Sequence, residues 1–463
     1  MIRGPAGWTP APGLLAEILR RHPALQDPDG PPGCTPVLGG ERRVCWTVRE
    51  YDVLLDSSNM DTKDWVRIAD DVVREHERYD GIVILHGTDT MAFTASALSF
   101  MLAELSRPVI LTGAQIPSTE ARSDAVDNLL GAMIFAGVHP VPEVCVYFDN
   151  TLFRGNRVRK VDADGLHAFS SANLPPLATM GVEADVNWHL VRPVSGNALK
   201  VRPITCSDVA VLRLFPGISA RVVRNVLAAP LRGAIVETFG SGNAPDNRPD
   251  LLDAFREASE RGVVLVNCTQ CARGTVRPDY AAGRALLDAG VVPGLDMTAE
   301  AALTKLAYLL SQPELLPEAV RSLMVTDLRG ELSSPNRPLA ASFRERELVR
   351  SVHRVLGGAL PEAAGAIYPV LLCGAAASGD LVALNRMARD GVDLRMTDYD
   401  GRTALHLAAA EGRRATVAWL LEQGLSADAE DRWGRSPRAE AEQAGHHDVM
   451  VLLDAFPGLT ARQ

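Results

Sequence analysis

Short apolar runs alternate with amphipathic stretches through the first two-thirds of the chain, from about residue 36 to residue 300. This alternation is typical of βαβ units, which build a parallel sheet with helices on both faces. In the first half the pattern predicts strands at 44–48, 81–85, 109–112 and 144–148. It predicts helices at 61–79, with Asp61 as N-cap, at 91–105 and at 123–137.

The pattern loosens between about residues 173 and 207, where proline and polar residues are frequent. We place a domain boundary in this stretch, so that two α/β domains are expected at 1–190 and 205–350. Ser311 to Glu314 has the pattern of a capping box that opens a further helix. The second domain is expected to contain strands at 209–214, 234–237 and 263–266, and helices at 218–228, 250–261, 282–289 and 298–310.

The last ninety or so residues have a different pattern, because glycines recur in three registers with a spacing of 33 residues. A period of 33 is that of ankyrin repeats, and the stretch 401–409 (Gly-Arg-Thr-Ala-Leu-His-Leu-Ala-Ala) is close to their signature. We expect about three repeats, an all-α stack, at 366–457. The stack either offers a surface to a protein partner or docks on the rest of the chain. The first register contains Gly379, Gly412 and Gly445, the second contains Gly391 and Gly424, and the third contains Gly401 and Gly434.

Composition is that of an ordinary globular protein, with 47% hydrophobic and 22% charged residues. The formal net charge of −10 makes nucleic acid binding unfavourable. No apolar run approaches the roughly 20 residues of a membrane span. The segment 1–20 is interrupted by prolines and lacks the apolar core of a secretory signal. We therefore expect a cytoplasmic protein without nucleic acid or membrane partners.

Seven cysteines are scattered along the chain, an odd number that argues against a disulfide framework. Cys268 and Cys271 have the spacing of a metal or redox pair. A metal site would need further cysteines or histidines at ligand spacing, and none follows in the sequence. Two ordinary thiols at the end of a strand are the favoured interpretation, and no metal site is expected.

The segment after the 81–85 run has the strongest indication of chemistry. His86, Gly87, Thr88, Asp89 and Thr90 end an apolar strand, and the 91–105 helix begins at once. Ligands bind at the carboxyl ends of strands in open α/β sheets, so the Thr88 hydroxyl and the Asp89 carboxylate are candidates for a site. The alternative is that Asp89 or Thr90 only caps the helix.

Six ordered motifs in residues 1–350 resemble the asparaginase family, in particular its cytoplasmic type I branch. The resemblance implies a two-domain asparaginase-like α/β fold with parallel sheets. Together with the ankyrin repeats it is similar to the two-part asparaginases of animals and some bacteria, whose animal members are also linked to lysophospholipase activity. The motifs are Asp56-Ser-Ser-Asn-Met60, His86-Gly-Thr-Asp-Thr-Met-Ala92, Leu111-Thr-Gly-Ala-Gln-Ile-Pro117, Arg154-Gly-Asn-Arg-Val-Arg-Lys160, Phe239-Gly-Ser-Gly-Asn-Ala-Pro245 and Val266-Asn-Cys-Thr-Gln-Cys271.

The resemblance implies a catalytic group formed by Thr88, Asp89 and Lys160. Lys160 matches the family's catalytic lysine and would be the general base, its neutral form favoured by desolvation. Thr88 would relay the proton or act as nucleophile, and Asp89 would hold the lysine and the ammonium group of the substrate. No metal and no organic cofactor is implied.

The same resemblance implies a set of substrate-binding positions. Ser57 and Ser58 match residues that bind the α-carboxylate and α-amino end of the substrate. Gly87 and Ala114 would line the pocket with backbone groups that polarise the amide. Asn243 matches a residue that reaches the site of a neighbouring subunit, which implies a homodimer or homotetramer.

Each of these residues also has a purely structural interpretation. Lys160 lies in a basic segment and could belong to a solvated face. Ser57 and Ser58 follow Asp56 and could form a turn or cap. His86 is expected to be a packed residue at a strand end rather than a base, because no acidic residue is paired with it in the sequence.

The chain departs from the family in one respect. The family opens with a strand that ends in a Thr-Gly-Gly-Thr-Ile-Gly loop, which carries a first catalytic threonine, and this segment is absent here. Residues 14–19 resemble the helix that follows this loop. We expect that Met1 is a misplaced start and that the natural protein extends upstream.

The expected function is hydrolysis of L-asparagine to L-aspartate and ammonia. One alternative is an inactive asparaginase-like body that presents the ankyrin repeats to a partner. Another is a lysophospholipase-type hydrolase, which the lack of a Gly-x-Ser-x-Gly elbow disfavours. Glutamine is compatible as a side substrate, because one methylene group discriminates by only about 1–3 kcal/mol. Activation by asparagine at a second site near 267–271, known in bacterial type I relatives, is left open.

Overall fold

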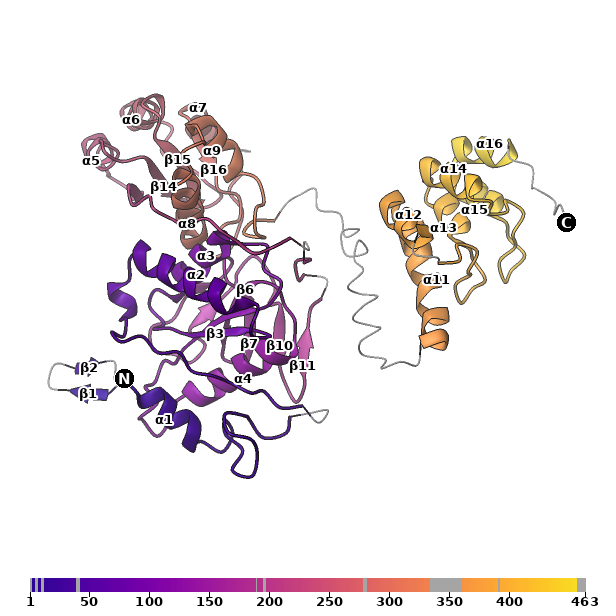
Figure 1. Cartoon of the computed structure of the whole chain (residues 1–463). Coiled ribbons are helices and arrows are strands. Elements are labelled where there is room, and N and C mark those ends of the chain that lie inside the picture. The colour runs from indigo at the N-terminus through magenta and orange to yellow at the C-terminus, as the bar shows by residue number, and fades with distance from the viewer. Residues whose placement is uncertain are drawn as a thin grey trace. The chain divides into compact units, whose positions relative to one another are not determined.

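The chain divides into two compact units, Met1–Ser334 and Pro335–Gln463, and each is described by itself. Figure 1 shows both as a cartoon of the computed structural model. The structure describes residues 2–4, 7–9, 12–38, 42–188, 190–194, 197–277, 281–333, 360–389 and 392–455.

The first lobe of the first unit is built on a six-stranded sheet with the order β11-β10-β7-β6-β5-β3. Strands β3, β5 and β6 are parallel, and β7, β10 and β11 continue the sheet in antiparallel fashion. The strands expected at 81–85, 109–112 and 144–148 are confirmed. The bounds are Ile82–Leu85 (β3), Val109–Thr112 (β5), Val144–Phe148 (β6), Thr151–Arg154 (β7), Ala178–Met180 (β10) and Ala184–Val186 (β11).

Strand β3 is an edge strand, so it is less buried than its continuous apolar run (81–85) indicates. Leu85, its last residue, is 42% exposed, whereas Val109, Ile110 and Leu111 of β5 are fully buried. Among the described residues β3 pairs only with β5, and one side of its backbone therefore lacks a neighbouring strand. The residues that follow β3 consequently lie at a corner of the sheet that is accessible to solvent.

Helices cover this sheet much as the hydrophobic pattern predicts. Asp61 caps α2 in a reciprocal capping box with Asp64, as expected from the sequence. Almost every residue of α3 from Met91 to Met101 is buried, which agrees with a helix that has no charged face. The helices are Leu14–Arg21 (α1), Thr62–His76 (α2), Met91–Met101 (α3) and Ala125–Val138 (α4), with a 3-10 turn at Ser57–Asn59 (η1).

The second lobe contains a four-stranded parallel sheet with the order β13-β14-β15-β16. Ser311 does not open a helix, which corrects the expected capping box. It ends α8, and its hydroxyl accepts hydrogen bonds from the backbone of Thr205 and Cys206 at 2.9 Å each. The elements are Val209–Arg213 (β13), Ala220–Val226 (α5), Gly233–Thr238 (β14), Pro249–Glu260 (α6), Val264–Thr269 (β15), Ala281–Asp288 (α7), Val291–Pro293 (β16), Ala299–Leu310 (α8) and Pro317–Met324 (α9).

The two lobes share one hydrophobic core. Helix α3 of the first lobe packs on α8 of the second, and the rings of Phe100 and Tyr308 stack with centroids 6.0 Å apart. Short two-stranded pairings complete this unit. They are Ile2–Gly4 with Gly7–Thr9 (β1, β2), Leu102–Ala103 with Lys200–Val201 (β4, β12) and Arg159–Lys160 with Phe169–Ser170 (β8, β9).

The stretch 44–48 is not a strand, contrary to the expectation. It makes only an isolated bridge, in which Cys34 faces Cys45, and these two cysteines form a disulfide. The Thr35 backbone amide donates to the Val44 carbonyl, and Trp46 donates to Gly33. The segment is therefore held as a loop by the bridge and the disulfide, which the number and scatter of the cysteines did not predict.

The second unit consists of helices arranged in repeats, as the glycine period predicts. Gly379, Gly412 and Gly445 have φ values of 77°, 65° and 77°, which explains why glycine recurs at this register. No helix among the described residues is long and apolar enough to cross a membrane. The helices are Leu360–Ser378 (α11), Leu381–Arg389 (α12), Ala404–Ala410 (α13), Arg414–Glu422 (α14), Pro437–Ala444 (α15) and His447–Asp454 (α16).

The ankyrin signature has a clear structural role in this unit. His406 is fully buried, and its Nδ1 accepts a hydrogen bond from the Thr403 amide at 3.1 Å. Its Nε2 lies 3.0 Å from the carbonyl oxygen of Arg435 in the next repeat. One side chain thus caps its own helix and bonds to the following repeat.

Candidate active site

The site is formed at the end of β3, in the segment between this strand and α3. Thr90 occupies the N-cap position of α3 but makes no side-chain cap. Its hydroxyl donates instead to the carbonyl of Ser57 at 2.7 Å. The helix-capping alternative therefore does not describe this segment, whose side chains point to other parts of the lobe.

Lys160 reaches this segment from the β8–β9 hairpin. Its Nζ donates hydrogen bonds to Thr88 Oγ1 at 2.9 Å and to Asp89 Oδ1 at 2.7 Å. The lysine side chain is 20% exposed and the Asp89 side chain 69%. Lys160 is thus in direct contact with the other two residues predicted to form a catalytic group, although it lies 72 and 71 positions after them in the sequence. The site is therefore open to solvent, and the desolvation expected around Lys160 is only partial.

Gly87 allows Ser57 to approach the end of β3. A Cβ atom at position 87 would lie 2.3 Å from Ser57 Oγ, so no larger residue fits there without a shift. Ser57 is only 6% exposed. The structure therefore places the buried Ser57 hydroxyl against the residue that precedes Thr88.

Ser58 has different surroundings, because it is exposed and bonded to Asp56. The Asp56 carboxylate accepts a hydrogen bond from the Ser58 amide at 3.0 Å and from its hydroxyl at 2.8 Å. These hydrogen bonds hold the pKa of Asp56 below its usual value. The local cap that the sequence offered as an alternative is thus present at Ser58.

Ala114 lies in the turn that follows β5, beside the end of β3. A Cβ atom at Gly113 would lie 2.3 Å from the carbonyl oxygen of His86, so the ends of the two strands approach closely. The Asp124 carboxylate accepts hydrogen bonds from the amides of Gln115 and Ile116 at 3.1 and 3.0 Å. This carboxylate fixes the turn that carries Ala114 next to the Thr88 segment.

Gln115 is a residue of the site that sequence reasoning did not select. Its Oε1 accepts a hydrogen bond from the Thr88 hydroxyl at 3.1 Å. Gln115 lies in one of the motifs that resemble the family, but its sequence neighbours do not indicate that its side chain crosses to Thr88. The contact exists because the turn after β5 and the segment after β3 lie next to each other in the folded chain.

His86 has the packed environment expected for a strand-end residue. Its Nδ1 lies 2.6 Å from the Gly87 carbonyl oxygen and its Nε2 lies 2.9 Å from Thr94 Oγ1. Burial lowers its pKa, and the contact with the Gly87 carbonyl opposes this shift only in part. Both ring nitrogens have partners within the lobe.

Asn243 lies in the second lobe, on the loop after β14. Its backbone exchanges hydrogen bonds with Phe239, at 2.8 and 3.0 Å. Among the hydrogen bonds of the described residues, none joins Asn243 to Thr88, Asp89 or Lys160. The structure of one chain thus does not bring it to the group, and its role at a neighbouring subunit stays a prediction.

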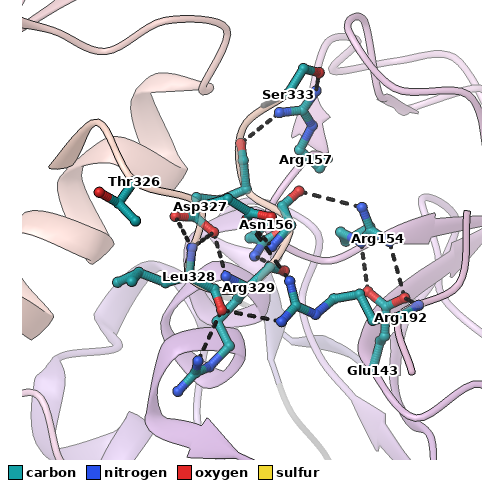
Figure 2. A network of polar contacts seen from close by, with 12 residues as sticks. Glu143, Arg154, Asn156, Arg157, Arg192, Thr326, Asp327, Leu328, Arg329 and Ser333 are labelled. Carbon is teal, nitrogen blue, oxygen red and sulfur yellow. Dashed lines mark hydrogen bonds and ion pairs between the residues drawn. The ribbon is translucent and has the colours of Figure 1, made fainter. Parts of the chain in front are cut away.

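The segment that leads to Lys160 is fixed by buried ion pairs, and Figure 2 shows the one between Arg154 and Glu143. Arg154 donates to both carboxylate oxygens of Glu143, at 2.6 and 3.1 Å. Arg157 pairs with Asp296 of the second lobe at 2.7 Å, and these two side chains are 2% and 6% exposed. Arg154 and Arg157 therefore do not form a solvated basic face.

The segment 326–333 completes this network from the second lobe (Figure 2). The Arg157 guanidinium also donates to the Glu331 carbonyl at 2.7 Å and to Ser333 Oγ at 3.0 Å. Asn156 Nδ2 donates to the carbonyl of Arg329 at 3.0 Å. The position of the strand that carries Lys160 thus depends on contacts with both lobes.

Cys268 and Cys271 are both free thiols. Cys268 is buried, and desolvation raises its pKa to about 12, whereas Cys271 is exposed. Among the described residues no group of three or more metal-ligating side chains is gathered. The structure gives these two cysteines unlike surroundings rather than a shared site.

Comparison with known proteins gives a consistent result along the chain. The family model described as "Asparaginase, N-terminal" matches residues 8–192, and "Glutaminase/Asparaginase C-terminal domain" matches residues 208–324. "Ankyrin repeats (3 copies)" matches residues 372–458. The matched segments contain Thr88, Asp89 and Lys160 in the first and Asn243 in the second.

Individual relatives agree with these matches. The L-asparaginase of Dirofilaria immitis is 44% identical over 89% of this chain and 70% of its own length. The 60 kDa lysophospholipase of Mus musculus is 46% identical over 84% of this chain and 69% of its own. The crystal structure of L-asparaginase I from Vibrio cholerae has a TM-score of 0.59 and 51% identity, covering 62% of this chain and 87% of that one. The chain belongs to the asparaginase family and carries ankyrin repeats after its second lobe.

Proposed function

We propose that this chain hydrolyses L-asparagine to L-aspartate and ammonia. The observation that carries the proposal is the direct bonding of Lys160 to both Thr88 and Asp89 at the end of a strand. L-asparaginases at 44–47% identity support the choice of substrate. Neither a metal nor an organic cofactor enters the proposed reaction.

The proposed chemistry uses the three residues in different roles. Lys160, in its neutral form, removes a proton from the Thr88 hydroxyl or, through it, from a water molecule. The oxygen so activated attacks the side-chain amide carbon, and the amide nitrogen leaves as ammonia after it takes a proton from Lys160. Attack by water gives L-aspartate directly, whereas attack by Thr88 gives an ester that a water molecule, activated by Lys160, then hydrolyses to L-aspartate. Asp89 holds the lysine and binds the ammonium group of the substrate.

The remaining predicted residues surround this centre in the proposal. Ser57 and Ser58 bind the α-carboxylate and α-amino end, and backbone groups at Gly87 and Ala114 polarise the amide. Asn243 serves the site of a neighbouring copy in a homodimer or homotetramer. We further propose that the protein is cytoplasmic and that the ankyrin repeats bind a protein partner.

Hydrolysis of a lysophospholipid is the second candidate, favoured by the name of the mouse relative. Both activities are measured on the same preparation, as ammonia released from L-asparagine and L-glutamine and as fatty acid released from lysophosphatidylcholine. We expect ammonia from asparagine at a rate well above that from glutamine. Fatty acid release without ammonia release would overturn the proposal, and neither product from folded protein would favour an inactive body.

A further inference from the structure

The side chain of Gln115 bonds to two segments of the candidate site at once. Its Oε1 accepts a hydrogen bond from Thr88 Oγ1 at 3.1 Å. Its Nε2 donates to the carbonyl oxygens of Ala163 at 3.2 Å and Gly165 at 3.0 Å. One amide thus connects the segment after β3 to the turn that follows Lys160.

These contacts fix which way the amide faces. The Ala163 and Gly165 oxygens can only accept hydrogen bonds, so the amide nitrogen must point to them. The amide oxygen is then the atom that faces Thr88, and it can only accept. The single hydroxyl hydrogen of Thr88 is therefore donated to Gln115.

The direction of that hydrogen matters because Lys160 bonds to the same oxygen. Lys160 Nζ donates to Thr88 Oγ1 at 2.9 Å. The threonine oxygen thus presents a lone pair to the lysine and its hydrogen to the glutamine. To give its proton to Lys160, the Thr88 hydroxyl has to turn away from Gln115.

The turn on the other side of the amide is closed and short. Asp162 Oδ1 accepts hydrogen bonds from the amides of Asp164 at 2.8 Å and Gly165 at 2.9 Å. These bonds hold the pKa of the Asp162 carboxyl below its usual value. Because this turn begins directly after Lys160, a bond to Gly165 restrains the position of the lysine.

We propose that Gln115 is a positioning residue, which sets the direction of the Thr88 hydroxyl and its spacing from Lys160. The inference rests on the proposed function, since it assigns Gln115 a part in the same site. Gln115 transfers no proton itself, because a neutral amide oxygen is too weak a base. It acts on the rate through Thr88 and Lys160.

The test replaces Gln115 by methionine, which has similar length and forms none of the three bonds. A misplaced reacting group reduces turnover more than ground-state binding, so we expect kcat to fall about 10- to 100-fold. We expect KM for asparagine to stay within about twofold, because Gln115 is not among the proposed substrate-binding residues.

Gln26 provides a matched control in the same unit. Its Nε2 donates to the carbonyls of Asp27 and Pro31 at 2.8 and 3.2 Å, and its Oε1 accepts from the Gly33 amide at 2.7 Å. Gln26→Met therefore removes the same kinds of bond far along the chain from Thr88. We expect this variant to retain the kcat of the parent protein.

A second measurement does not depend on turnover. The lysines of the chain are Lys63, Lys160, Lys200 and Lys305, so acylation by acetic anhydride can be followed at each by mass spectrometry. In Gln115→Met, the turn that follows Lys160 loses its bonds from the amide, so the Lys160 amine is less firmly held against Thr88 and Asp89 and more accessible to the reagent. We expect the acylation of Lys160, relative to the exposed Lys200, to rise severalfold in this variant and not in Gln26→Met.

The outcomes separate this inference from the proposed function. If the parent protein releases ammonia, an unchanged kcat in Gln115→Met overturns the inference. If the parent protein is inactive, the proposed function fails, and the acylation ratio of Lys160 alone decides the role of Gln115. A Gln115→Met variant that fails to fold beside a folded Gln26→Met variant would also overturn it, because the residue would then be structural.

Discussion

Two lysine–carboxylate pairs of the first unit have the same chemical groups but opposite surroundings. Lys160 lies 2.7 Å from Asp89, with side chains 20% and 69% exposed. Lys305 lies 2.5 Å from Glu331, and both side chains are fully buried. The exposed Lys160–Asp89 pair can contact a substrate and exchange a proton with it. The buried Lys305–Glu331 pair cannot be reached by a substrate.

The hydrogen bonds around the two lysines differ in the same way. Lys305 also donates to the carbonyls of Met324 and Thr326, at 3.2 and 2.6 Å. Lys160 has instead a side-chain hydroxyl, that of Thr88, as its second partner. Carbonyls and a carboxylate carry no proton that Lys305 could take, whereas the hydroxyl that faces Lys160 carries one, so that only Lys160 can act as a base. Partners and exposure, more than residue type, thus separate a lysine that is suited to catalysis from one that serves the fold.

The largest effect on stability is expected from replacing Lys305. Lys305→Met removes the only ion-pair partner found for the buried Glu331 carboxylate among the described residues and leaves it with hydrogen bonds from the Leu328 and Arg329 amides, which lowers the free energy of unfolding by about 4 kcal/mol. Lys160→Met should change it by less than about 1 kcal/mol, because the pair with Asp89 is largely exposed on one side. Urea unfolding of both variants, with Lys200→Met as exposed control, measures the difference. Equal destabilisation by the two changes would remove the distinction between the pairs.

A somewhat smaller and pH-dependent effect is expected at the Arg157–Asp296 pair. Desolvation alone would raise the pKa of Asp296, but its hydrogen bonds and the Arg157 charge outweigh this and hold the pKa below 3.8. The carboxylate therefore stabilises the fold above its unfolded pKa, and this contribution is lost as the pH falls through the lower folded value.

Asp296→Asn should reduce the free energy of unfolding by about 3 kcal/mol at neutral pH. The difference from the parent protein should begin to shrink below about pH 4, where Asp296 of the unfolded parent takes up a proton, and should continue to shrink through the lower pKa of the folded state. Urea titrations across this range measure it. A difference that stays constant down to about pH 2 would show that the charge of Asp296 does not matter.

The smallest effect is expected in the second unit. His406→Ala leaves buried partners of the imidazole without hydrogen bonds, which destabilises the repeats by about 1–3 kcal/mol. Faster hydrogen exchange should be confined to peptides of the second unit, from 360–389 and 392–455, with ammonia release unchanged. Faster exchange in peptides around Thr88 would show instead that the two units are energetically coupled.

Much of the fold could be predicted because local pattern and tertiary structure agree. The strands at 109–112 and 144–148 end where the sequence indicates, and the glycine registers of the repeats coincide with positive φ values. The prediction was wrong where the outcome depends on distant neighbours. The apolar run of β3 is typical of a buried strand, yet β3 lies at a sheet edge. The stretch 44–48 is predicted as a strand, yet it makes only an isolated bridge.

In the candidate site, too, some residues could be predicted from the sequence and others depend on distant neighbours. Thr88, Asp89 and Lys160 could be selected through the resemblance to the family, and the structure brings them into contact. Gln115 could not be selected, because its role depends on two segments about 27 and 50 residues away meeting its amide. Sequence patterns identify groups with suitable chemistry, but a side chain that acts by holding others is visible only in three dimensions.

The most direct test of this account is ammonia release from L-asparagine by the parent protein and by Lys160→Ala, at equal concentrations of folded protein. The account predicts that the parent releases ammonia and that the variant loses about three orders of magnitude in kcat, the scale of a general base, without loss of stability. Full activity in Lys160→Ala would contradict the account, because the open lysine–carboxylate pair would then take no part in the reaction.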